Sequence, residues 1–85
     1  MDYRNVNICE RIKDIMHEES LSQKELASKT GVVQSSISAI LGGKRSPDPL
    51  VNAMNEKMGI SKEWLINGAG LKYENSKIIA EYNQN

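Results

Sequence analysis

The stretch that most constrains this chain runs from Ser22 to Gly42, SQKELASKTGVVQSSISAILG, and predicts two short helices joined by a tight turn. Ser22 can cap the first helix while Glu25, three residues later, reaches back to the amide of Ser22, which is the reciprocal arrangement of a capping box. We therefore expect this helix to begin at Gln23. Gly31 predicts its end, because a residue without Cβ can adopt the left-handed backbone that a sharp turn needs.

The second helix, predicted over residues 33–41, follows within two or three residues of the turn and is amphipathic. Its apolar side chains recur at the i, i+4, i+7 and i+8 positions of one helical face, which predicts that this face packs on the core. They are Val33, Ile37, Ile40 and Leu41. The outer face is short, polar and uncharged, and it contains Gln34, Ser35, Ser38 and Ala39. Two helices with a glycine turn and amide and hydroxyl groups facing outward are typical of a helix-turn-helix that enters the DNA major groove.

Length and composition favour one small all-helical domain. The chain has 85 residues, which is enough for one domain with a modest core. Phenylalanine is absent and no run of alternating β-branched residues occurs, so we expect an all-α, compact bundle of five short helices. The single cysteine, Cys9, can form no internal disulfide and is expected to be a small buried residue. No stretch resembles a secretory signal or a membrane span, which predicts a cytoplasmic protein that does not enter membranes.

A helix is predicted before the central pair. It runs from Val6 to about Glu19, and Asn5 or Asn7 could cap its start. Its core-facing residues follow the helical period. They are Val6, Ile8, Ile12, Ile15 and Met16.

Two more helices are predicted after the central pair. Ser46 can cap the first of them, with Pro47 at its first helical position and Gly59 at its end. Ser61 can cap the last helix, KEWLIN, which Gly68 closes. The apolar face of the longer helix consists of Leu50, Val51, Met54 and Met58.

The charges are unevenly distributed along the chain although the net charge is zero. From residue 20 to residue 45 the chain contains four basic residues and one acidic residue, a local excess of three positive charges. Such an excess can direct a basic face toward DNA while the remaining surface stays neutral or acidic. The alternative is a solvated surface on which these charges cluster by chance. The residues concerned are Lys24, Lys29, Lys44, Arg45 and Glu25.

Several residues of the central stretch occur at the offsets of a known family pattern: a first glutamine, a Leu-Ala pair, a turn glycine and two later branched aliphatic residues. They are Gln23, Leu26, Ala27, Gly31, Ile37 and Ile40. The chain thus resembles the Cro/C1-type (Xre-like) family of phage and bacterial repressors. The resemblance extends from about residue 6 to residue 70, including WLINGAG, and implies a lambda-repressor-like fold and double-stranded DNA as the partner.

The outer face of the second central helix contains the candidate base contacts. Gln34 lies at the start of the helix, the end that enters the groove, and its amide can pair with adenine N6 and N7. Ser35 can contact a base or a phosphate. Ser38 suits a small polar contact, and Ala39 suits a thymine methyl group. The alternative for these residues is ordinary exposure to solvent.

The candidate phosphate contacts lie at helix ends and in the following loop. Gln23 begins a helix, so its side-chain amide and backbone N–H can both bind an anion, and Ser36 could also reach the DNA backbone. The resemblance implies that the loop GGKRSP lies along the DNA backbone, which assigns phosphate contacts to Lys44 and Arg45. The alternative is a flexible loop whose charges only favour solubility.

The chain departs from the family pattern just before the second central helix. The family commonly has Ser or Thr there, whereas this chain has Val32 and Val33, and the missing cap costs about 1 kcal/mol. That helix also contains no Lys or Arg to contact guanine. We therefore expect weak binding by a monomer, and a homodimer that binds two half-sites about 34 Å apart or a multiple of that. A preference for A·T-containing steps is also expected.

Three regions are predicted along the chain: a flexible arm over residues 1–5, the DNA-binding domain over residues 6–70 and a tail over residues 71–85. The tail is polar apart from a few apolar residues. Three interpretations stay open: a disordered tail, an element that closes a dimer, or a linker to a further domain. The family resemblance adds that such repressors often contain a C-terminal oligomerisation domain of self-cleaving peptidase type.

The sequence as a whole predicts a sequence-specific DNA-binding transcriptional regulator of the phage or prophage repressor kind. Two alternatives remain: a protein-interaction module of antitoxin or antirepressor type on the same fold, and the DNA-targeting domain of a larger self-cleaving repressor. No catalytic residues are assigned, because no paired carboxylates, nucleophile and base, or phosphate loop can be assembled. His17 has no second ligand at a suitable spacing, so no metal is expected, and no cofactor or small-molecule ligand is evident.

Overall fold

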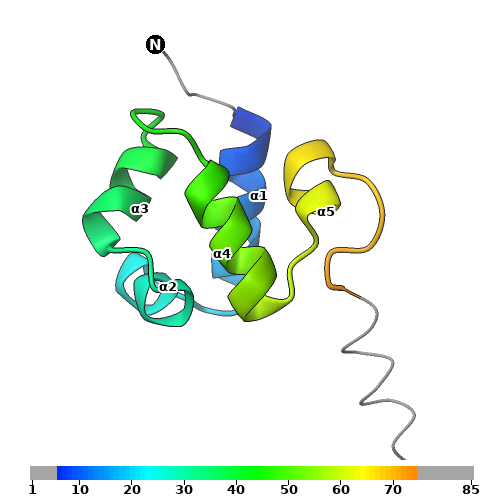
Figure 1. Cartoon of the computed structure of the whole chain (residues 1–85), viewed down its shortest axis with the longest axis horizontal. Helices are drawn as coiled ribbons and strands as arrows, with labels where there is room; N and C mark the ends of the chain where they lie inside the picture. Colours follow the sequence, from blue (N-terminus) through cyan, green and yellow to red (C-terminus); the bar gives the residue numbers. More distant parts are fainter. Residues whose placement is uncertain (1–5, 75–85) are drawn as a thin grey trace, which may run out of the picture.

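The computed structural model describes residues 6–74, and these residues form five helices and no strand longer than an isolated bridge between Ile60 and Tyr73. The helices are α1 (Val6–Glu18), α2 (Gln23–Thr30), α3 (Gln34–Leu41), α4 (Asp48–Met58) and α5 (Lys62–Asn67) (Figure 1). The prediction of an all-α bundle of five short helices is therefore confirmed. None of these helices is long and apolar enough to cross a membrane.

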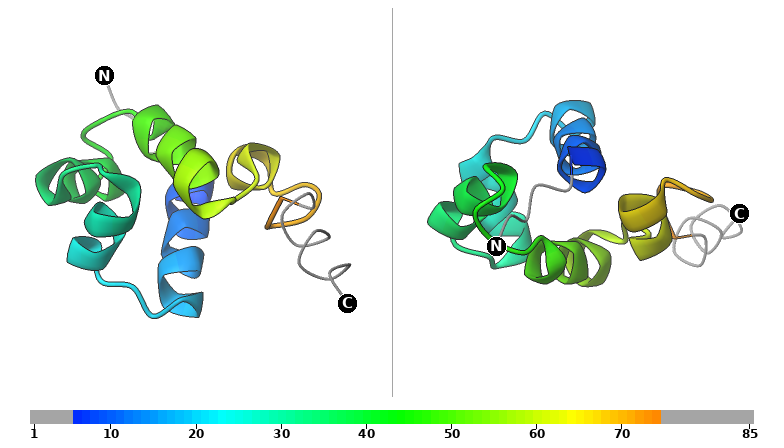
Figure 2. Two further views of the ribbon diagram at one scale, coloured as in Figure 1. Left: turned by 60° about the horizontal axis from the view of Figure 1, so that its bottom comes forward. Right: turned by 90° about the horizontal axis from the view of Figure 1, so that it is seen from above.

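The helices are arranged with α1 and α4 in the middle of the bundle. The α2–α3 pair lies on one side of them and α5 on the other, as the views in Figure 1 and Figure 2 agree. One end of the molecule thus consists of the helix-turn-helix, and the opposite end consists of α5 and the segment after it.

The start and end of α2 agree with the prediction. The Ser22 hydroxyl accepts a hydrogen bond from the Glu25 amide (3.1 Å), and the Ser22 amide donates to the Glu25 carboxylate (2.9 Å). The bond from the Ser22 amide lowers the pKa of Glu25. Gly31 ends the helix with φ +77°, a left-handed conformation that residues with a Cβ rarely adopt.

The start of α3 differs from the prediction at one residue. Val33 was expected to pack on the core, but it precedes the first helical turn, in extended conformation, and its side chain is 64 % exposed. The apolar stripe therefore begins at Ile37, which is buried together with Ile40, while Leu41 is partly buried. As expected, the valine supplies no side-chain cap to the helix.

The end of α1 agrees with the prediction, but one of the two candidate caps does not. The helix ends at Glu18, against a predicted end at about Glu19, and Asn7 lies within the helix, so Asn7 is not its cap. The alternative cap, Asn5, lies outside the described residues. Core-facing residues of this helix are buried as predicted at Ile8, Ile12 and Ile15.

The start of α4 lies one residue later than predicted. Pro47 precedes the helix instead of occupying its first position, and the first helical residue is Asp48. The Ser46 hydroxyl still accepts a hydrogen bond from the Asp48 amide (3.3 Å), so serine satisfies the first free amide from one position further out. For α5 the predicted ends are confirmed, since the Ser61 hydroxyl accepts from the Trp64 amide (3.2 Å).

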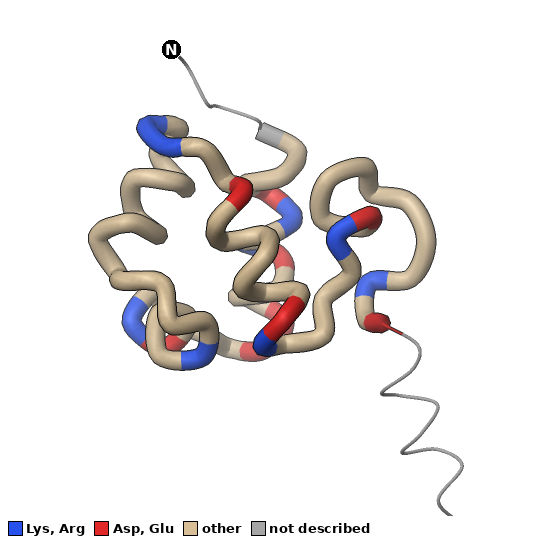
Figure 3. Tube along the Cα trace, viewed as in Figure 1, with Lys and Arg blue, Asp and Glu red and all other residues tan. Residues whose placement is uncertain are grey.

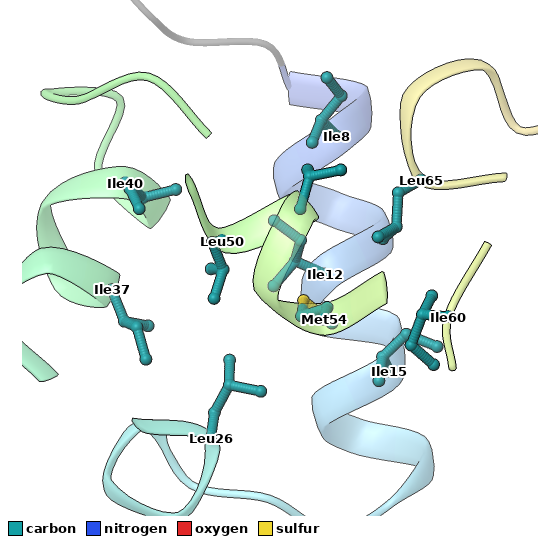
Figure 4. Packing of buried hydrophobic residues seen from close by; sticks show 11 residues of the cluster. Ile8, Ile12, Ile15, Leu26, Ile37, Ile40, Leu50, Met54, Ile60 and Leu65 are labelled. Atoms are coloured by element: carbon teal, nitrogen blue, oxygen red, sulfur yellow. The ribbon is translucent and has the colours of Figure 1, made fainter. Parts of the chain in front are cut away.

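The core draws on every helix of the bundle. Its buried side chains converge between α1, α4 and the α2–α3 pair, with α5 closing the far side (Figure 4). The cluster consists of Ile8, Ile12, Ile15, Leu26, Ile37, Ile40, Leu50, Val51, Met54, Ile60 and Leu65. Because α3 shares this core, its orientation is fixed by the rest of the bundle and not only by the turn.

The segment over residues 71–74 returns to the bundle after α5. The Ser61 amide donates to the Lys72 carbonyl (2.8 Å), and the Glu74 amide donates to the Gly59 carbonyl (2.8 Å). Two of the first four residues of the predicted tail, Lys72 and Glu74, thus pair through their backbones with the link between α4 and α5. The remainder of that tail, residues 75–85, and the predicted arm over residues 1–5 lie outside the described residues.

Side chains of the same segment contact the end of α1. The Tyr73 hydroxyl lies 3.2 Å from the Glu18 carboxylate and 2.9 Å from that of Glu19, and Lys72 pairs with Glu18 at 2.6 Å. Burial and the Glu19 carboxylate raise the pKa of Tyr73, and the bond from Lys72 lowers the pKa of Glu18. The Lys72 ammonium also lies 5.0 Å from the ring centroid of Trp64, a cation–π distance.

Candidate nucleic-acid interface

The outer face of α3 lies at the edge of the bundle, away from α5 (Figure 1). Gln34, Ser35 and Ser38 are exposed on it, and Ala39 is half-buried. All four predicted base contacts are therefore on α3, and the three polar ones face solvent. The helix contains no charged residue, so the polar groups of its outer face are an amide and hydroxyls.

The turn between α2 and α3 depends on a residue that the sequence analysis did not select. Thr30 is buried, and its hydroxyl donates to the Leu26 carbonyl (2.7 Å) while accepting from the Val32 amide (3.2 Å). The side chain thus joins the last turn of α2 to the residue that leads into α3. A threonine directly before the turn glycine is the sequence signal that could have identified this role.

A second contact fixes the other end of α3. The Cys9 thiol, on α1, is buried as predicted and lies 3.5 Å from the Ile40 carbonyl, to which it donates. Burial raises the pKa of this thiol, so it stays protonated and keeps its hydrogen for the contact. Both ends of α3 are therefore attached to the bundle while its outer face stays open.

Basic residues lie beyond both ends of α3. Figure 3 shows them in the loop after α3, which contains Lys44 and Arg45, and on α2, which contains Lys24 and Lys29. All four are exposed. An uncharged helix between two basic regions matches the alternation of base edges and phosphates that a helix in the major groove meets.

Two of the predicted phosphate contacts touch each other. The Arg45 guanidinium donates to the Ser36 hydroxyl at 2.9 Å, from the loop back to α3. Lys44 is exposed in the same loop. The structure thus places the Arg45 guanidinium beside Ser36, in the first turn of α3, and Lys44 lines the same hollow as these two residues.

Gln23, the remaining predicted phosphate contact, lies separately at the start of α2 and is partly buried. The capping box uses the amide of Glu25, so the amides of Gln23 and Lys24 are left to bind another acceptor. The Glu25 carboxylate lies at the same helix end and is ionised. It partly offsets the attraction of this helix end for an anion.

No group of three or more His, Cys, Asp or Glu residues that could hold a metal ion occurs between residues 6 and 74. His17, the lone histidine considered from the sequence, is exposed near the end of α1.

Comparison with known proteins supports the assignment of the central unit. No solved structure matches the chain significantly. The model of a family described as a helix-turn-helix domain matches residues 9–71. This match covers most of the chain and includes α2, the turn at Gly31 and α3. The chain therefore belongs to the helix-turn-helix domain family.

Proposed function

We propose that this chain is a sequence-specific DNA-binding transcriptional regulator of the Cro/C1 type, acting as a phage or prophage repressor in the cytoplasm. The observation that supports this most is the outer face of α3, where exposed polar side chains lie between two basic regions. Helix-turn-helix domains insert the second helix of the unit into the major groove. In this chain that helix is α3.

The base contacts start at the N-terminal end of α3. Gln34 is the first residue of the helix, and its amide can donate to adenine N7 and accept from adenine N6. Ser35 and Ser38 offer hydroxyl groups that donate or accept, and Ala39 offers a methyl group to thymine. This set favours A·T-containing steps, because no arginine or lysine is present on α3 to contact guanine.

The phosphate contacts are divided between the two ends of α3. Lys44 and Arg45 bind one segment of the DNA backbone, and the amide of Gln23 binds another. Ser36 contributes through Arg45, because its hydroxyl already accepts a hydrogen bond from that guanidinium. Two copies of the chain on half-sites about 34 Å apart then provide the affinity that one copy lacks.

Selection from a random duplex library at low salt tests this proposal. We expect the full chain to enrich one sequence family, and Gln34→Ala to lose about 1–3 kcal/mol of binding free energy for the enriched duplex. The variant should also relax the preference at one base position. The matched control is Asn67→Ala, which removes an exposed amide on α5, at the opposite end of the bundle, and should bind like the parent chain.

The alternative of a protein-interaction module predicts a different result. In that case no sequence is enriched, and Gln34→Ala and Asn67→Ala bind duplex DNA equally weakly. Either finding would remove the case for base recognition by α3.

A further inference from the structure

A hollow of about 360 Å³ lies between α3, the loop after it and the start of α4. This volume is at the lower end of the range of small-molecule sites, about 300–1,000 Å³. Its apolar wall consists of Val32 from the turn, Ile40 from α3 and Pro49 from α4. The hollow is therefore large enough for a small ligand and offers it a hydrocarbon surface.

The remaining wall of the hollow is polar and basic. It consists of the cations Lys44 and Arg45 and the hydroxyls of Ser36 and Ser46. No carboxylate between residues 6 and 74 forms an ion pair with either cation. The acidic residue nearest along the chain, Asp48, is not part of the wall.

The donors of this wall are only partly used. Arg45 donates one N–H to Ser36, and a guanidinium has five N–H groups in a planar fork that suits a carboxylate or a phosphate. The Ser46 hydroxyl accepts from the Asp48 amide and keeps its own hydrogen to donate. An anion at the mouth of the hollow could therefore accept hydrogen bonds from several donors at once.

We propose that this hollow binds a small organic monocarboxylate whose hydrocarbon part lies on Val32, Ile40 and Pro49 while its carboxylate is bound by Lys44 and Arg45. The apolar part of the wall is covered only by a hydrocarbon group, and the basic part is paired only by an anionic group. An inorganic anion leaves the apolar wall uncovered, and an uncharged hydrocarbon leaves the cations without a partner. A DNA phosphate, in contrast, can pair with the two cations without contacting the apolar part of the wall.

Binding in the hollow also competes with DNA. The same Lys44 and Arg45 contact phosphate in the proposed function, and this part of the inference rests on that function. A carboxylate held by both residues offsets one of their two positive charges and occupies donors that a DNA phosphate would use. The site therefore makes DNA binding sensitive to the concentration of the ligand.

Titration of the ¹⁵N-labelled full chain with hexanoate, without DNA, tests the site itself. We expect saturable shifts confined to the amides that surround the hollow, including those of Ser36, Ile40 and Arg45. Acetate has the charge without the hydrocarbon, and hexyltrimethylammonium has the hydrocarbon with the opposite charge. Both should produce no saturable shift there at the same concentration.

A pair of variants tests whether the amide shifts with hexanoate depend on the Arg45 guanidinium. Arg45→Gln removes the guanidinium from an exposed loop, and it should weaken hexanoate binding about fivefold. Lys62→Gln removes a cation from α5 and should leave the binding unchanged. Equal shifts with acetate, shifts spread over the whole surface, or equal binding by the two variants would overturn the proposal.

Competition is measured separately on the enriched duplex. Hexanoate should lower the affinity of the parent chain for this duplex, and hexyltrimethylammonium at the same concentration should not. If hexanoate fills the hollow without lowering the affinity, the regulatory part is wrong while the DNA-binding function stands. If the chain enriches no duplex, the proposed function fails, and the titration without DNA still decides whether the hollow binds the carboxylate.

Discussion

The hydrogen bond from Arg45 to Ser36 lowers the entropy that Arg45 loses when it binds an anion at the candidate interface. Ordering a freely rotating arginine side chain completely costs about 2 kcal/mol in rotamer entropy. The bond to Ser36 already orders the guanidinium before any anion arrives. Less is therefore lost on binding, and the pair acts as one unit although each residue could be taken from the sequence as a separate phosphate contact.

Val33 is the residue where a single change should stabilise the fold. It precedes α3 with its side chain 64 % exposed and with no cap, so Val33→Ser supplies the missing acceptor without removing a buried group. We expect a gain of about 1 kcal/mol over Val33→Ala, equivalent to about 4–8 °C in the midpoint of thermal unfolding. Urea and thermal unfolding of the two variants measure this difference. Equal stability of Val33→Ser and Val33→Ala would show that the hydroxyl does not cap α3.

Among the elements, α5 depends most on contacts outside itself. It has six residues, too few for a stable isolated helix. The Arg11 guanidinium, on α1, donates to the carbonyls of Leu65 (3.1 Å) and Ile66 (3.0 Å), which have no partner within the helix. The position of α5 is therefore fixed by a side chain from the other end of the sequence.

Gly68→Ala tests this attachment of α5. A Cβ at residue 68 would lie 2.7 Å from the Arg11 guanidinium, whereas a Cβ at residue 59 meets nothing within 4 Å. Both glycines have φ +72°, so Gly59→Ala is a matched control for the backbone cost, about 1–2 kcal/mol. We expect Gly68→Ala to cost about 1 kcal/mol more in urea unfolding, because Arg11 must leave its carbonyl acceptors. In an Arg11→Ala background the two substitutions should cost the same, and a persistent difference would contradict the role of Arg11.

The elements that could be predicted from the sequence are those whose determinants are local. The capping residues Ser22 and Ser61 lie three residues from the amides that they bind, so a short pattern identifies the helix starts. Arg11 and its acceptors are 54 and 55 residues apart, and no periodicity reports such a contact. The sequence pattern places Val33 on the core-facing side of the helix because Val33 fits the apolar i, i+4 period of Ile37 and Leu41. The helix itself begins one residue later, at Gln34, so the period does not report its start.

For the whole molecule, the distribution of charge matters more than its sum. The net charge of the chain is zero. Salt, however, limits the range over which each surface charge acts to about 8–10 Å at ordinary ionic strength. A DNA duplex at α3 therefore meets mainly the basic residues beyond the two ends of that helix, whereas the charges on α5 are distant from it (Figure 3). The spacing of these cations along the sequence predicted this pattern. The hollow beside them could not be predicted, because Val32, Ile40 and Pro49 meet only after the turn, α3 and α4 have packed.

This local excess predicts a measurable salt dependence in spite of the zero net charge. Each phosphate neutralised by a cation releases condensed counterions, so the logarithm of the binding constant falls with the logarithm of salt concentration by about 0.9 per contact. Lys44→Ala should reduce the slope for the enriched duplex by about one such contact and weaken binding to all sequences alike. Lys62→Ala, which removes an exposed cation from α5, should leave the slope unchanged. Fluorescence anisotropy at several salt concentrations separates the two variants, and an equal change in both would mean that the DNA does not approach the molecule from the α3 side.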